Sequence, residues 1–323
     1  MHNLCTKSGV QSLDFQPVKH PIVSIVMAEY NCMPYLPDAI KSVLNQTYPH
    51  FELIVVDDHS DDGSYSYAEQ QQRLDSRIRL LTNKEKGAGS ARNYGISCAN
   101  GDYLLFLDGD DVFYPTMLES LIKTASSTEA EITLCNYHIN GEGFNQDTPA
   151  LKYLKAGAFL FNCFHSGVLL DKVNKSAWNK LYEKKFVLKN GLVFQNCRHA
   201  NDVYFVMTAF LRSSHIAVVD SPLMLYFLRK NGTQGKKQKD PLEIMVPIKA
   251  LLVDAANYEH LWQRTAALHL ALSLFCFDYA SFANPVTKKK LSEVMADCLR
   301  NSSSLSNVPL RNSDKKLFHQ LCE

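Results

Sequence analysis

The chain has 323 residues, of which 46% are hydrophobic, and a formal net charge of +1. This length and composition predict a globular protein with one large domain and a smaller one. A nearly neutral chain argues against a protein that binds nucleic acid through its bulk charge.

Nine cysteines are scattered along the chain without a C-x-x-C pair. Such a set predicts neither a disulfide framework nor a zinc site, and it indicates a reducing compartment. The N-terminus lacks the basic-then-apolar layout of a signal peptide. The apolar stretch 266–283 contains His269 and Asp278, so it is expected to be a buried helix. We therefore expect a cytoplasmic protein, with at most peripheral contact with the inner face of the cytoplasmic membrane.

From Pro21 onward, short apolar runs alternate with stretches of helical periodicity. The apolar runs predict strands at 22–27, 53–56, 78–81, 103–107 and 132–135. The stretches between them predict helices at 35–44, after Ser64, at 89–99 and at 115–126. This alternation predicts an α/β fold in which residues 21–137 form a parallel sheet covered by helices.

The alternation weakens beyond residue 140. The segment 150–230 mixes short strands and helices, and 229–240 is a basic, polar stretch that is expected to be a loop. The apolar spacing over 241–300 predicts helices.

Acidic residues directly follow two of the predicted strands, as Asp57-Asp58 and as Asp108-Gly109-Asp110-Asp111. Ligands of open parallel sheets bind at the carboxyl ends of the strands, so these carboxylates are expected to face one crevice. Crowded carboxylates favour a hard cation such as Mg²⁺ or Mn²⁺. A single Asp-Asp pair is more often a cap or a turn, but two clusters on one sheet favour a functional site.

Several motifs together resemble the family 2 glycosyltransferases. In the first half they are Val23-Ser24-Ile25-Val26, Tyr30-Asn31, Ser42 to Tyr48, Glu52 to Asp58, Ser60 to Ser64, Gly89 to Gly95, Gly101-Asp102-Tyr103 and Phe106 to Asp111. In the second half they are Ser176 to Tyr182, Asn201 to Phe205, Pro222-Leu223 and Tyr226. This resemblance implies the GT-A fold, a Rossmann-like, mostly parallel sheet with flanking helices, here with a smaller acceptor region and C-terminal helices.

The resemblance also implies a function. It predicts an inverting enzyme that moves a hexose or N-acetylhexosamine from a UDP-sugar to a saccharide or lipid-linked acceptor, in bacterial surface polysaccharide or lipopolysaccharide synthesis. Residues 1–20 are then a tail, 21–230 the catalytic domain and 241–323 a helical region. Within the catalytic domain, 21–137 bind the nucleotide-sugar and 138–230 form the acceptor side. Nucleic acid is not an expected partner, and the sequence leaves open whether the protein forms a homo-oligomer.

By the same resemblance, single residues receive roles. The nucleotide-sugar is expected to lie against Ala28, Tyr30, Asn31, Asp58, Arg92 and Asp108. Asp58 would accept a hydrogen bond from the base, and Arg92 would brace the nucleotide or its phosphates, or else pair with one of the aspartates.

Asp108 and Asp110 are expected to hold Mn²⁺ or Mg²⁺, with Asp110 in direct contact. Asp202 is the candidate general base that takes the proton of the acceptor hydroxyl. Its neighbour in sequence is Asn201, where many family members have Glu, so we expect Asp202 to lack a like-charge neighbour and to be ionised at neutral pH.

Three further residues are weaker candidates on the acceptor or phosphate side. Trp178 either stacks on a sugar or belongs to the core. Lys180 and Arg229 could meet phosphates, although lysines are usually solvated surface residues.

The chain departs from the family pattern where many members carry a proline near the end of the first strand. This chain has Met27-Ala28-Glu29 there, which places a glutamate near the expected nucleotide pocket.

Two alternatives remain from the sequence. A nucleotidyltransferase would share the sheet and the acidic site, but its Gly-rich basic signature is absent from 22–35. A non-catalytic relative that binds sugar nucleotides would be indicated by loss of Asp110 or Asp202, and both are present. No G-x-G-x-x-G follows the first strand, which argues against a dinucleotide oxidoreductase.

Overall fold

The computed structural model of the protein describes residues 20–141, 144–148, 173–198, 200–228, 242–301, 308–310, 314, 315 and 317. In chain order, its elements are β1 (Val23–Glu29), α1 (Leu36–Leu44), β2 (Phe51–Asp57), α2 (Ser64–Leu74), β3 (Ile78–Thr82), α3 (Ala88–Cys98), β4 (Tyr103–Asp108), β5 (Val112–Phe113), α4 (Met117–Thr128), β6 (Ile132–Gly141), β7 (Phe144–Thr148), β8 (Lys180–Glu183), α6 (Lys184–Lys189), α7 (Val203–Arg212), β9 (Ile216–Leu228), α8 (Met245–Asn257), α9 (Leu261–Ser281) and α10 (Pro285–Arg300).

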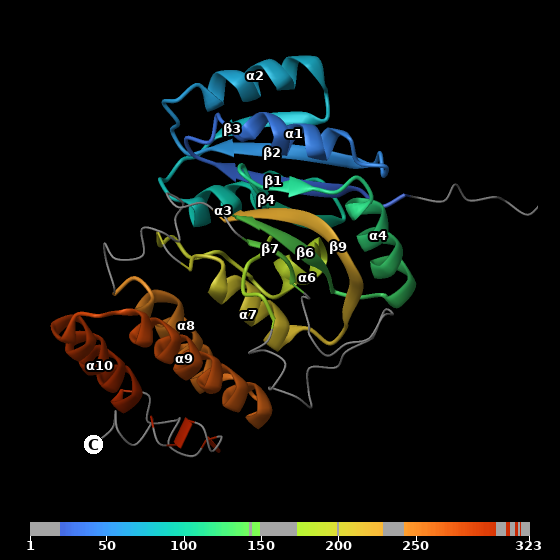
Figure 1. Cartoon of the computed structure of the whole chain (residues 1–323). Coiled ribbons are helices and arrows are strands. Elements are labelled where there is room, and N and C mark those ends of the chain that lie inside the picture. The colour runs from blue at the N-terminus through green and yellow to red at the C-terminus, as the bar shows by residue number, and fades with distance from the viewer. Residues whose placement is uncertain are drawn as a thin grey trace, which may run out of the picture.

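One mixed sheet runs through the molecule (Figure 1), with strand order β3-β2-β1-β4-β8-β6-β9-β5 and β7 paired to β6. The first four strands of this order are parallel, and β8 is antiparallel to both β4 and β6. The predicted α/β fold is confirmed. The strand predicted at 132–135 exists as β6, but it does not continue the parallel set because β8, from later in the chain, lies between β4 and β6.

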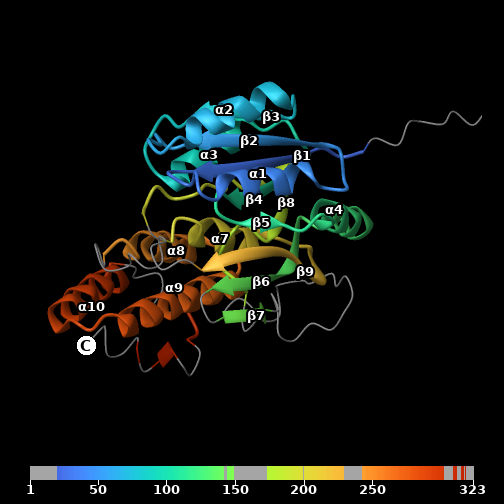
Figure 2. The same ribbon diagram turned by 45° about the horizontal axis from the view of Figure 1, so that its top comes forward.

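Two apolar layers cover the two faces of the sheet. Side chains of a strand point alternately to opposite faces. Val23, Ile25 and Met27 therefore pack in one layer with the helices α1 and α4, while Val26 packs in the other layer with α3 and α7. Figure 2 shows α1 and α3 on different sides of these strands. Both faces are buried, so the strands read as apolar runs.

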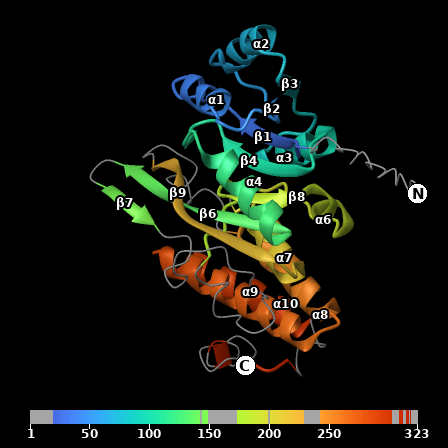
Figure 3. The same ribbon diagram turned by 90° about the vertical axis from the view of Figure 1, so that its right-hand side faces the viewer.

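The C-terminal helices α8, α9 and α10 gather at the end of the molecule away from α2 (Figure 3). The middle of α9 is buried, and it shares one core with α7 and α8. The Tyr204 hydroxyl of α7 donates to Asp254 Oδ2 of α8 at 3.0 Å. The α8–α9 layer thus supports α7, the helix that begins at the candidate base. Among the described residues, no helix is both long enough and apolar enough to span a bilayer.

Helix α3 lies very close to β1 at Gly95. A Cβ atom added to Gly95 would lie 2.3 Å from Val26 Cγ1, so only glycine leaves room for the strand. Arg92 lies three residues earlier, on the same side of the helix. The close contact at Gly95 therefore fixes where Arg92 stands relative to the sheet.

Replacing Gly95 by valine should lower the free energy of unfolding by about 2–3 kcal/mol, because overpacking forces the helix away from the strand. Urea unfolding of the wild type and the variant measures this difference. Val26→Ala in the same chain should restore part of the loss, since it removes the carbons that the new side chain meets. Ser97→Val, on the exposed side of α3, is the control for a β-branched residue in the helix. Equal effects at positions 95 and 97 would show that α3 is not tightly packed on β1.

Candidate functional site

The carboxyl ends of β1, β2 and β4 meet at one edge of the sheet. In register, Glu29 of β1 lies beside Asp57 of β2, and Ala28 lies beside Asp108 of β4. The two acidic clusters of the sequence therefore lie together. Asp202 reaches the same place from the first turn of α7, close enough to Asp108 to be affected by its charge.

Asp58 organises the loop between β3 and α3. Its carboxylate accepts hydrogen bonds from the Asn83 side chain at 2.7 Å and from the Gly87 backbone N–H at 2.9 and 3.0 Å. Gly87 has φ of 131°, where a side chain would be strained. A carboxylate has about four acceptor sites, so Asp58 can still take a hydrogen bond from a base.

Tyr30 and Asn31 follow β1 on the exposed side of this edge. The Tyr30 ring is 50% exposed, and the Lys86 ammonium lies 5.2 Å from its centroid. Asn31, with φ of 51°, exchanges two hydrogen bonds with Asp61 through its side chain, at 2.8 and 2.9 Å. Tyr30 thus presents a ring to an incoming ligand, whereas Asn31 braces the loop.

Arg92 is the centre of the site. The residue is 7% exposed, and its guanidinium donates to Asp108 Oδ1 and to Asn201 Oδ1, each at 2.5 Å. Burial opposes its charge, but the carboxylates of Asp108 and Asp202 raise the pKa of Arg92 above its usual value. Of the two roles expected for Arg92, the structure shows the ion pair with an aspartate.

Asp202 is the N-cap residue of α7, yet its side chain makes no capping hydrogen bond. Burial raises the pKa of Asp202, Arg92 lowers it, and the charge of Asp108 raises it further; the net direction is upward. The expectation that Asp202 lacks a like-charge neighbour is wrong. Its neighbour in sequence is neutral, but Asp108 comes to it from a distant strand.

Asp108 is the last residue of β4 and Asp110 lies on the turn that leads to β5, and both are partly exposed. Asp111 is fully buried and accepts the Phe227 N–H at 3.0 Å, which ties this turn to β9. Among the described residues, no group of three or more His, Cys, Asp or Glu side chains could enclose a metal ion. Two carboxylates fit a Mg²⁺ or Mn²⁺ ion of the kind that takes its other ligands from phosphate and water.

The weaker candidates lie differently from a ligand site. Trp178 is 5% exposed and stacks on Tyr226, with ring centroids 5.3 Å apart, so it belongs to the core. Lys180 is fully buried, and its ammonium donates to Asn174 O, Ser176 O and Asn179 Oδ1 at 2.7–2.8 Å. An ammonium has three donors, so these bonds leave Lys180 none for a phosphate. Arg229 lies outside the described residues.

Sequence reasoning missed Asn83, which is 2% exposed. Its side-chain amide bridges Asp58 and the Gly87 carbonyl, and its oxygen accepts the Ser90 hydroxyl. Asn83 directly follows β3, so the criterion that identified Asp57 and Asp108, a polar residue at a strand's carboxyl end, would have found it.

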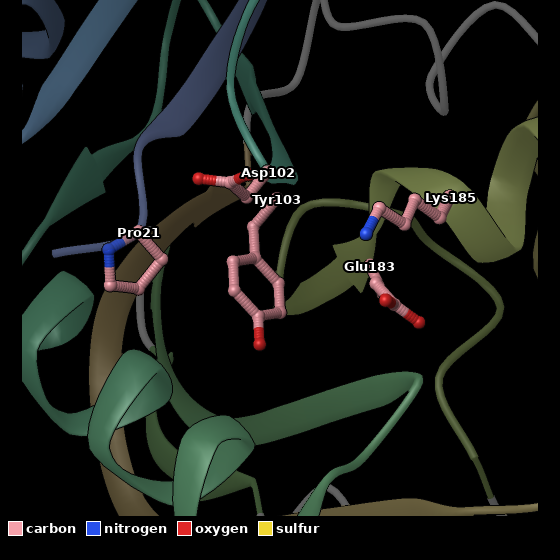
Figure 4. Close-up of a pocket in the computed structure, with 5 residues that line it drawn as sticks. All are labelled: Pro21, Asp102, Tyr103, Glu183 and Lys185. Atoms are coloured by element: carbon pink, nitrogen blue, oxygen red, sulfur yellow. The ribbon is translucent and has the colours of Figure 1, made fainter. Parts of the chain in front are cut away.

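A shallow pocket of about 240 Å³ lies elsewhere, lined by Pro21, Asp102, Tyr103, Glu183 and Lys185. Figure 4 shows the Tyr103 ring between Pro21 on one side and Glu183 and Lys185 on the other. Because Pro21 precedes β1 and Tyr103 begins β4, this pocket is at the amino ends of these strands. It is therefore separate from the acidic edge.

The family model for glycosyl transferase family 2 matches residues 24–213, which is more than half of the chain. EpsH of Bacillus subtilis (strain 168) is 30% identical over 237 residues, covering 69% of this chain and 65% of that protein. The cholesterol galactosyltransferase of Borreliella burgdorferi is 32% identical over 216 residues, covering 64% of this chain and 60% of that protein. The chain thus spans less than two thirds of the length of both relatives.

The fold is also that of a solved structure. The crystal structure of residues 1–349 of TarS from S. aureus in complex with UDP-GlcNAc superposes with a TM-score of 0.79, at 18% identity, covering 94% of this chain and 87% of that one. At this identity the likeness concerns the fold, whereas the match to the family model is one of sequence. Together with the carboxylates at the expected edge of the sheet, that match shows that the chain belongs to glycosyl transferase family 2.

Proposed function

We propose that the protein is an inverting glycosyltransferase that moves a hexose or N-acetylhexosamine from a UDP-sugar to a saccharide or lipid-linked acceptor, in the synthesis of a bacterial surface polysaccharide or lipopolysaccharide. Residues 21–137 would bind the donor and 138–230 the acceptor. The observation that carries the proposal is the buried Arg92, which draws Asp108 and Asp202 into one site. The TarS structures with UDP-GlcNAc and UDP support a uridine donor.

In this reaction Asp202 is the base. As the acceptor hydroxyl attacks the anomeric carbon, its proton passes to the Asp202 carboxylate and the bond to the diphosphate breaks. Proton transfer to a positioned base contributes about 10²–10⁴-fold to a rate. Burial raises the pKa of Asp202 and Arg92 partly counters this, and the net rise makes Asp202 a stronger base than a free aspartate.

Asp108 and Asp110 would hold the metal ion through their carboxylate oxygens. When bound, such an ion supplies positive charge that stabilises the departing diphosphate. The bond from Arg92 to Asp108 Oδ1 fixes the orientation of one of these ligands before the donor arrives.

Asp202→Asn should lower kcat by about 10²–10⁴-fold, because it keeps size and polarity but removes the base. The dissociation constant of the donor should change little. In the wild type, kcat should fall as pH drops through the pKa of Asp202, which lies above that of a free aspartate. Asp297→Asn, on exposed α10, is the control. A near-normal kcat for Asp202→Asn would remove this residue from the role, and donor binding without any transfer by the wild type would favour a non-catalytic relative.

The donor prediction concerns Asp58. UDP should compete with the donor better than GDP or dTDP, and Asp58→Asn should weaken UDP binding by about tenfold, as expected for loss of a hydrogen bond to a charged group. Calorimetry with each nucleotide measures both effects. Asp75→Asn, at the amino end of β3 beside Arg77, is the matched control. Stronger competition by GDP or dTDP would show that uracil is not the nucleobase of the donor.

Transfer should require a divalent cation. Chelation should abolish activity, and Mn²⁺ or Mg²⁺ should restore it. Asp110→Ala should raise the cation concentration needed for half-maximal activity, and it should weaken cation-dependent UDP binding measured by thermal shift. Full activity of the wild type in excess EDTA would contradict the metal role of Asp108 and Asp110.

A further inference from the structure

The residue at the end of β1 that departs from the family pattern is Glu29, and it is 3% exposed. Its carboxyl group accepts the Ser60 hydroxyl at Oε1, at 3.2 Å, and the Cys32 thiol at Oε2, at 3.3 Å. Its backbone carbonyl accepts the Asp58 N–H at 2.9 Å. Glu29 therefore touches the segments that follow both β1 and β2.

Glu29 also hydrogen-bonds to the carboxyl group of Asp57, its register partner on β2. Two buried carboxyl groups in contact share one proton, because two negative charges there would repel. Asp57 accepts the backbone N–H groups of His59 and Ser60, and its pKa is lowered although burial opposes this. The charge therefore resides on Asp57, and the proton on Glu29.

Burial raises the pKa of Glu29 to about 8, with the hydrogen bond and the charge of Asp57 adding to the effect. The side chains that shift this pKa are those of Asp57, Cys32 and Ser60, and none of them is a cation. Burial also raises the pKa of the Cys32 thiol above its usual value, and the charge of Asp110, on the turn after β4, adds to this. Cys32 thus stays a thiol while Glu29 titrates.

The two loops held by this pair carry the residues proposed to bind the nucleotide. The loop after β1 and the loop after β2 are joined by the Asn31 N–H to Ser60 Oγ at 3.0 Å, by the paired bonds of Asn31 and Asp61, and by the Met33 N–H to Asp62 Oδ2 at 2.9 Å. The Ser60 hydroxyl accepts from Asn31 and donates to Glu29. Through Ser60, the protonation state of Glu29 therefore affects the contact between the two loops.

We propose that Glu29 is a positioning residue of the nucleotide pocket. As a neutral acid it donates a hydrogen bond to Asp57 and holds the loops after β1 and β2 together, and it releases them when it ionises. While Glu29 is neutral, the two carboxyl groups of Glu29 and Asp57 share one proton and carry one negative charge. The ionised pair places a second charge beside Asp57, with no cation among the side chains that act on it. The choice of UDP as ligand rests on the proposed function, whereas the contact between Glu29 and Asp57 does not.

The first experiment measures UDP binding by calorimetry between pH 6 and pH 9 for the wild type and Glu29→Gln. The wild-type affinity should be level at low pH and fall above about pH 8, approaching tenfold per pH unit, which is the limit for loss of one proton. Glutamine keeps a donor for Asp57 but cannot ionise, so its affinity should not show this fall. Titration of UDP itself is common to both proteins and cancels in the ratio of their dissociation constants.

The second experiment needs no ligand and measures thermal unfolding over the same pH range, extended down to pH 5. An acid whose pKa is raised by folding favours the folded state while it holds its proton, and this contribution is lost as pH rises toward the folded pKa. The melting temperature of Glu29→Gln relative to the wild type should therefore rise up to about pH 8 and then level off. Asp57 does not confuse this result, because its pKa is lowered and its contribution is lost only at more acidic pH.

A third protein, Asp57→Asn, distinguishes a positioning role of Glu29 from a role in packing alone. Without the charge of Asp57, the fall in UDP affinity should move to lower pH, while burial still holds the pKa of Glu29 above the ordinary value of about 4.3 for glutamate. If Glu29→Gln does not fold, this shift decides the question in its place.

The outcomes distinguish the inference from the proposed function. If UDP binds and the ratio of wild-type to Glu29→Gln dissociation constants is the same at every pH, the proposed role of Glu29 is wrong, whereas the proposal of a UDP-sugar donor is unaffected. If UDP binds neither protein, the donor is wrong and the melting temperatures decide. A difference in melting temperature that rises toward pH 8 supports the shared proton, and a level difference overturns it.

Discussion

The burial of the Arg92 guanidinium is the constraint on which the site depends. A buried cation is strongly destabilising unless its charge and its donors are matched, so the chain must bring Asp108 and Asn201 to it. Asp108 ends a strand of the segment proposed to bind the donor, and Asn201 precedes the helix α7, in the segment proposed to bind the acceptor. One side chain on α3 therefore joins these two segments.

Because Asp202 follows Asn201, the hydrogen bond from Arg92 to Asn201 also places the candidate base. Burial alone would neutralise this carboxyl group, and Arg92 counters that effect while Asp108 adds to it. The result is a carboxylate that is more basic than a free aspartate and is still held near a cation. Environments that move the pKa of a carboxyl group in this way are typical of residues that transfer protons.

Lys180, at the start of β8, is a second buried ionisable residue of the same sheet, and there burial favours the neutral form. Burial lowers the pKa of Lys180 to about 7, although the charge of Asp202 opposes this change. Its three hydrogen bonds go to neutral oxygens of residues 174, 176 and 179. These bonds shape the chain as it enters β8, so Lys180 serves the fold rather than a ligand.

Local patterns predicted most of the strands and helices of 21–137, because apolar period and strand ends are properties of neighbouring residues. They also predicted that Asp58 and Asp108 would share one edge, because the ends of parallel strands must meet, whereas Arg92 was expected there from the family resemblance. They could not show that β8 lies between β4 and β6, nor that Asp108 is the like-charge neighbour of Asp202. Both facts depend on contacts between segments far apart in the chain, and periodicity carries no information about them.

In the proposed mechanism one carboxylate, that of Asp202, acts as base in a single displacement at the site around Arg92. The anomeric configuration of the first transfer product tests it most directly, and proton NMR of the anomeric coupling reads it during turnover. An α-linked UDP-sugar should give a β-linked product, because one displacement inverts the carbon once. An α-linked product would rule out a single displacement with Asp202 as base, since retention requires a second displacement or a different mechanism.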